Sequence, residues 1–127
     1  MDPALLAVAA LLSLVVLVHS IGGEILVIGP LRRHPDPPPL FGSPTLFVST
    51  IHATWHVASA LGLAATATVL AAAADPAVAA GSRFALQALL GAFVASAILV
   101  LGTTRGRHPA WVAFSLMSAG LVFALYA

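Results

Sequence analysis

Four long apolar stretches, separated by loops that carry most of the proline and arginine, constrain this chain more than any other feature. They cover residues of about 4–29, 45–73, 82–101 and 109–126. A helix of about 20 apolar residues crosses the hydrocarbon core of a bilayer. Because 61% of the residues are hydrophobic and only 7% are charged, the chain cannot give all four stretches a polar surface. We therefore predict an all-α integral membrane protein, in which two antiparallel helical hairpins form a four-helix bundle and residues 1–127 form a single transmembrane domain.

Prolines and capping residues mark the ends of the predicted spans. Pro30 is expected to stop the first span, and the loop 30–44 that follows contains six prolines, too many for a helix. Asp2 before Pro3 is typical of a helix start, with the acid as cap and proline at the first helical position. Pro109 opens the fourth span in the same way. The residues before the first span lack a basic leader, so no cleavable signal peptide is expected.

Arginine placement predicts the orientation in the membrane. The first and third loops carry four of the five arginines, whereas the opposite side has one arginine and two aspartates. Positively charged loops stay in the cytoplasm. We therefore predict the inner (cytoplasmic) membrane of a bacterium, with the first and third loops cytoplasmic and the N-terminus and C-terminus outside. The arginines of the two cytoplasmic loops are Arg32, Arg33, Arg105 and Arg107.

Composition excludes several classes of function. The chain has no cysteine, so it cannot form disulfides, bind metal through thiolates or use a thiol in catalysis. The net charge of +1 provides no basic surface for nucleic acid, and the lipid bilayer is the expected partner. No phosphate loop, nucleotide fingerprint or Ser-His-Asp set is present, so catalytic residues stay unknown. Small residues four apart in the third span, Gly91 with Ala95 and Ala92 with Ser96, suit close helix packing within the bundle or in a homo-oligomer.

Four ionisable residues lie inside the first two apolar stretches. Such groups are costly in hydrocarbon, so they usually face a bundle interior and mark a site. His52 and His56 are four residues apart and share one face of a helix. His19 and Glu24 are five apart and diverge by about 140° on an ideal helix. A common inward face for these two therefore needs a bend or bulge, for which Gly22–Gly23 is the expected place.

The same four residues lie at matching depths in the membrane. With a rise of about 1.5 Å per residue, His19 is level with His56, and Glu24 is level with His52. Imidazole and carboxylate are ligands for transition metals. We therefore predict a bundle site in which His19, Glu24, His52 and His56 bind an ion such as zinc, iron or copper, with redox or metal-assisted chemistry if the protein is an enzyme.

Three other interpretations remain open. A b-type haem could take one axial histidine from each span, which would use two of the four residues. Histidine with a buried glutamate could instead form a proton relay or a transport path. In the third interpretation the protein is a structural membrane subunit without a ligand. Its polar residues then only hydrogen-bond across helices, and Glu24 pairs with Arg105 or Arg107.

The chain contains three short patterns, His19-Ser20-x-x-Gly23-Glu24, Trp55-His56 and His108-Pro109-x-Trp111. Together these patterns resemble small four-helix bacterial membrane proteins of unassigned function. The resemblance covers the whole chain in spacing and supports the predicted fold. It adds Trp55 and His108 to the residues of interest and implies no activity.

Overall fold

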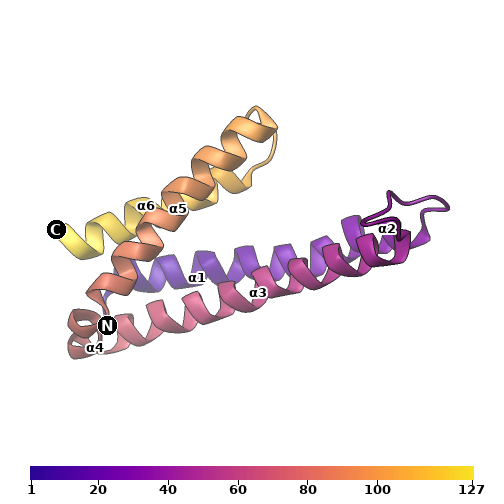
Figure 1. Ribbon diagram of the computed structural model, residues 1–127. Coiled ribbons are helices and arrows are strands. Elements are labelled where there is room, and N and C mark those ends of the chain that lie inside the picture. The colour runs from indigo at the N-terminus through magenta and orange to yellow at the C-terminus, as the bar shows by residue number, and fades with distance from the viewer. The chain divides into compact units, whose positions relative to one another are not determined.

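The computed structural model describes residues 1–127 and contains helices and loops without a β-strand, which confirms the all-α prediction (Figure 1). Four consecutive helical segments form the N-terminal quarter of the chain, and two of them are π-helical. In chain order the elements are α1 (Pro3–Leu17), η1 (Val18–Gly22), η2 (Glu24–Ile28), α2 (Gly29–Arg33), α3 (Pro44–Ala74), α4 (Pro76–Gly81), α5 (Arg83–Thr104) and α6 (Ala110–Tyr126).

Three of the helices are long and apolar enough to cross a membrane. They are the continuous helix Pro3–Arg33 with 31 residues, α3 with 31 residues and α5 with 22 residues. The fourth predicted span corresponds to α6, which is apolar but has only 17 residues.

The sequence predicted that the first helix would stop at Pro30. In the structure the helix continues to Arg33. Proline normally breaks a helix because its ring clashes with the carbonyl four residues earlier and because it lacks an N–H. Here the preceding turn is a π-helix, in which the N–H of Gly29 donates to the carbonyl of Glu24. The wider π turn changes the carbonyl positions ahead of Pro30 and accommodates the ring. The connecting loop is accordingly 34–43 and not 30–44.

Contacts divide the chain into two compact units. Residues 16–63, called here the hairpin unit, contain the end of α1, η1, η2, α2 and the first part of α3. Residues 1–15 and 64–127, called here the terminal unit, contain the start of α1, the end of α3, and α4 to α6. The single transmembrane domain stays a prediction.

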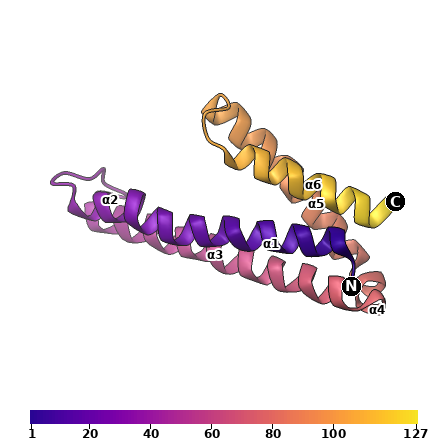
Figure 2. The same cartoon turned by 180° about the vertical axis from the view of Figure 1, so that it is seen from behind.

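The hairpin unit consists of two antiparallel helical segments joined by the loop 34–43 (Figures 1 and 2). The loop ends in a tight turn in which Leu40 and Ser43 exchange two backbone hydrogen bonds. Ser43 then caps α3, because its hydroxyl accepts a hydrogen bond from the N–H of Leu46 at 3.2 Å. Farther along the hairpin, Gly62 approaches Val16 so closely that a Cβ at position 62 would overlap the valine side chain.

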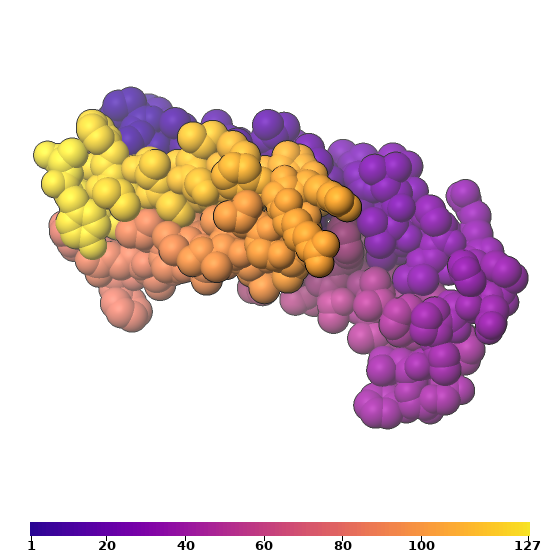
Figure 3. Space-filling view, turned by 90° about the horizontal axis from the view of Figure 1, so that it is seen from above, coloured from indigo at the N-terminus to yellow at the C-terminus, as the bar shows by residue number.

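The terminal unit is organised by caps and by a helical hairpin. The Asp2 carboxylate accepts hydrogen bonds from the N–H groups of Ala4 and Leu5 at 2.8 and 3.1 Å, which confirms the predicted cap. Helices α5 and α6 run antiparallel (Figure 1), and the atoms of the two segments touch in the space-filling view (Figure 3). The rings of Phe93 and Phe114 stack with their centroids 6.1 Å apart. The largest fully buried side chains in this unit are Val69, Leu86, Met117 and Leu121.

The cap at Asp2 gives a first test of the structure. Asp2→Ala removes the acceptor for two backbone N–H groups and should lower the free energy of unfolding by about 1 kcal/mol. Chemical unfolding of the purified protein in detergent measures this change. Asp36→Ala, in the proline-rich loop, removes the same charge without removing a cap and should leave stability unchanged. Equal effects of the two substitutions would contradict the capping assignment.

Candidate metal site of the hairpin unit

The helix leading to the candidate site is π-helical on both sides of Gly23. A π turn closes its hydrogen bond over five residues instead of four and is therefore wider than an α turn. Residues five apart, such as His19 and Glu24, then stand closer to one face than they would on an α-helix. The bulge that the sequence predicted at Gly22–Gly23 is thus present as two π-helical segments, η1 and η2. Such segments are often associated with functional sites.

Trp55 of α3 packs directly on the backbone of Gly23. A Cβ at position 23 would overlap the indole nitrogen, so only glycine permits this approach. The indole N–H donates to the carbonyl of His19 at 2.9 Å, and the two aromatic rings are parallel, with centroids 4.4 Å apart. The His19 Nε2 lies 3.4 Å from the carbonyl oxygen of Trp55. These contacts hold His19 against Trp55.

A hydroxyl pair continues the same contact between the two helical segments. The Ser20 hydroxyl donates to the Ser59 hydroxyl at 2.7 Å, and Ser59 in turn donates to the carbonyl of Trp55 at 3.3 Å. Ser59 is buried. Together with the Trp55 contacts, this pair fixes the register between η1 and α3.

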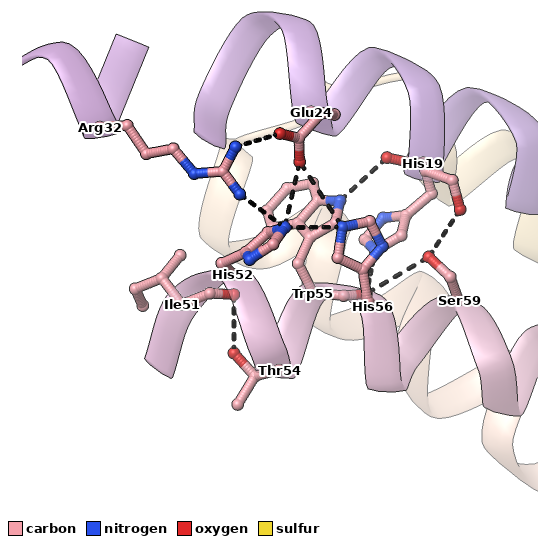
Figure 4. Close-up of polar contacts among 10 residues, drawn as sticks. His19, Glu24, Arg32, Ile51, His52, Thr54, Trp55, His56 and Ser59 are labelled. Atoms are coloured by element: carbon pink, nitrogen blue, oxygen red, sulfur yellow. Dashed lines mark hydrogen bonds and ion pairs between the residues drawn. The ribbon is translucent and has the colours of Figure 1, made fainter. Parts of the chain in front are cut away.

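The side chains of Glu24, His52 and His56 converge on one point of the hairpin unit (Figure 4). The His52 Nε2 and His56 Nε2 atoms lie 3.4 and 3.5 Å from Glu24 Oε2. The two Nε2 atoms are 3.0 Å from each other, as expected for histidines one helical turn apart. Three atoms that can each donate an electron pair therefore form a nearly equilateral triangle.

Arg32 closes the cluster from the last turn of α2. Its Nη1 donates to Glu24 Oε1 at 2.7 Å, and its Nη2 lies 2.8 Å from His52 Nε2. Because a guanidinium group can only donate, His52 Nε2 must accept and the ring carries its proton on Nδ1. Glu24 is thus paired with Arg32 and not with Arg105 or Arg107, which corrects that part of the structural interpretation.

Only one of the two carboxylate oxygens of Glu24 has a hydrogen-bond partner. Its side chain is 37% exposed, yet Oε2 itself is buried and has no hydrogen-bond partner. An acceptor without a donor costs free energy, about 1–3 kcal/mol when it is buried. A cation at the centre of the triangle would satisfy this oxygen together with the two imidazole nitrogens.

The spacing of the three atoms matches a tetrahedral metal ion. Two ligands of such an ion, each at about 2.0–2.1 Å, lie about 3.4 Å apart. The observed separations are 3.0, 3.4 and 3.5 Å. The triangle therefore has about the size of one face of a coordination tetrahedron, so these three atoms could hold such an ion.

The structure brings together three of the four ligands predicted from sequence. Glu24, His52 and His56 form the cluster, whereas the ring of His19 lies on Trp55. The haem interpretation needs one axial histidine from each span, but the ring of His19, the histidine of the first span, is stacked on Trp55. The geometry therefore supports an ion in preference to haem.

No protein-family model, curated protein or solved structure matches this chain.

The contact between Gly23 and Trp55 can be tested with a matched pair of substitutions. Gly23→Ala forces the indole away from the helix and should lower the free energy of unfolding by about 1–3 kcal/mol. The emission of Trp55 should shift as well, when it is measured in a Trp111→Phe background. Gly22→Ala is the control, because a Cβ there meets Val18 at an ordinary 4.0 Å and should be neutral or stabilising. Indistinguishable stabilities for the two variants would show that the close approach is wrong.

Proposed function

We propose that this protein is an integral membrane protein that binds a transition-metal ion through Glu24, His52 and His56. The observation that carries the proposal is the triangle of Glu24 Oε2 and two imidazole Nε2 atoms, with edges of 3.0 to 3.5 Å. Three such atoms at this separation need a proton or a cation between them, and the proposal assigns this place to a metal ion. One carboxylate and two neutral imidazoles suit zinc, iron and copper better than magnesium or calcium, which prefer oxygen ligands.

The open fourth position favours a working site over a purely structural one. Structural zinc sites are closed by four protein ligands, whereas catalytic sites keep one position for water or substrate. His19 could supply a fourth ligand only if its ring left Trp55 and lost the stacking contact. We therefore propose water or substrate as the fourth ligand and metal-assisted or redox chemistry as the class of reaction.

The exposed surface of the helices supports the membrane part of the proposal. Large apolar side chains on the outside of the hairpin unit are more than half exposed, among them Val18, Ile21, Ile25, Leu26 and Leu61. Water-soluble monomers rarely expose so many large apolar side chains along one stretch of chain. Lipid around a four-helix membrane bundle would cover them. From the arginine distribution we propose that both ends of the chain lie outside and that the loop 34–43 lies in the cytoplasm.

Substitution of the three ligands tests the metal proposal. Glu24→Gln, His52→Ala and His56→Ala should each weaken zinc binding by at least about 10- to 100-fold and leave the helix content unchanged. Titration of the protein in lipid nanodiscs against a zinc indicator measures the affinity, and elemental analysis with a visible spectrum of the purified protein identifies a native ion or haem. His34→Ala and His108→Ala are controls outside the cluster. Equal zinc affinity in the wild type and all five variants would contradict the proposal.

Glu24→Gln also separates metal binding from proton transfer. If the cluster were a proton relay, this substitution would abolish proton movement into vesicles, and added metal would not change the melting temperature of the wild type. Under the metal proposal, zinc, copper or iron raises the melting temperature of the wild type and has a much smaller effect on Glu24→Gln.

The absence of cysteine makes the proposed orientation easy to test. Each introduced thiol is unique, so an impermeant maleimide reports the side on which it lies. Asp36→Cys and Arg107→Cys should be protected in intact cells, whereas cysteine added after Ala127 should be labelled from outside. Permeabilised cells provide the control for access. Labelling of the residue after Ala127 only in permeabilised cells would reverse the proposed orientation.

A further inference from the structure

The guanidinium of Arg32 uses the same electron pair that a metal ion would need. Its Nη2 lies 2.8 Å from His52 Nε2, and its Nη1 lies 2.7 Å from Glu24 Oε1 (Figure 4). A neutral imidazole has one acceptor nitrogen. Once that nitrogen accepts from Arg32, it cannot also bind an ion.

We infer that Arg32 and the metal ion are alternative partners of His52 Nε2, so that Arg32 sets the affinity of the site. This inference rests on the proposed function of the cluster. In the state described here, the guanidinium is the counter-cation of the acid. When an ion binds, Arg32 leaves His52 and the ion takes over the electron pair.

Charge explains why the two cations exclude each other. With both imidazoles neutral, Glu24 and Arg32 leave the cluster with no net charge, which limits the cost of its position between apolar segments. A dication added beside an Arg32 still bound to His52 would place two positive groups within a few ångströms in a medium of low dielectric constant. Repulsion then adds to the competition for the lone pair.

The structure also has space into which the Arg32 side chain can move when it leaves His52. Its side chain is 44% exposed and belongs to α2, whose last residue, Arg33, directly precedes the loop 34–43. A cavity of about 360 Å³ lies beside it, bordered by Glu24, Ile25, Gly29, Arg32 and Arg33. Rotation of the long side chain into this space would free His52 without unfolding the helix.

Arg32 should therefore make the site weaker and more selective than its three ligands alone. An ion must bind His52 strongly enough to replace the charge-assisted contact that Arg32 Nη2 makes with its Nε2 atom. Transition-metal dications meet this requirement through their affinity for imidazole, whereas magnesium and calcium do not. The measured association constant equals the intrinsic constant multiplied by the fraction of molecules in which Arg32 does not bind His52.

Removal of the guanidinium tests the inference with zinc as the probe. Arg32→Gln in nanodiscs should bind zinc at least about tenfold more tightly than the wild type, because every molecule is then free to bind. Arg32→Lys, which keeps the charge but lacks the planar fork, should lie between the two. Arg33→Gln is the matched control: it removes the neighbouring arginine, which has no contact with the three ligands, and should leave the affinity unchanged.

A second measurement needs only the wild-type protein. Phenylglyoxal modifies free guanidinium groups, and peptide mass spectrometry separates Arg32 from Arg33. Zinc should raise the modification rate of Arg32 several-fold and leave that of Arg33 unchanged. This result does not depend on how well a variant folds.

The outcomes distinguish this inference from the proposed function. If wild type binds zinc but Arg32→Gln binds it equally or more weakly, and zinc leaves Arg32 unreactive, the inference is overturned and the metal site stands. If neither protein binds zinc, copper or iron, the proposed function fails and the inference fails with it. Tighter binding by Arg32→Gln together with zinc-dependent reactivity of Arg32 supports both.

Discussion

The contact of Trp55 with Gly23 fixes the register on which the candidate site depends. Only a bare backbone admits the indole there, and the indole N–H then holds the carbonyl of His19 on the same turn. The π-helical segments on either side bring Glu24 around the helix axis toward α3. Since His56 directly follows Trp55 in sequence, an aromatic anchor and a candidate ligand occupy adjacent positions of α3. A shift at this anchor would displace the acid and the histidines relative to each other.

The cluster itself is a balance of charges among apolar segments. Arg32 compensates the charge of Glu24 at Oε1, whereas Oε2 faces the nitrogens of two imidazole rings. The balance is incomplete, because Oε2 is buried and accepts no hydrogen bond. If the cluster served packing alone, the protein would be more stable with a hydrogen-bond donor to Oε2 or with an apolar residue in place of Glu24. An uncompensated acceptor facing two imidazoles is instead what a cation site requires before the cation arrives.

Sequence reasoning predicted the helical class, the histidine pair on α3, Glu24 and the bulge, because each depends on local spacing and on the cost of charge in an apolar segment. It missed the contact of Arg32 with the cluster, since Pro30 was expected to end the helix and Arg32 was assigned to a loop. The π turn that tolerates Pro30 depends on hydrogen bonds that no residue pattern specifies. The position of His19 was missed for another reason. Its depth in the span placed it level with His56, but depth does not show that the imidazole ring stacks on the flat face of Trp55 instead.

All residues of the candidate site belong to the hairpin unit, within residues 16–63. The candidate ligands come from two adjacent antiparallel segments, and the guanidinium of Arg32 lies about two turns beyond the acid on the same helix. A site built this way needs no other part of the chain to assemble. The loop 34–43 links the helix that carries Glu24 and Arg32 to the helix that carries the histidines. In the proposed metal-bound state, an ion would join these two helices, and displacement of Arg32 would change the last turn before the loop. Occupancy of the site would therefore affect the structure of the hairpin unit at its loop end. The arginines predict that this end lies on the cytoplasmic side.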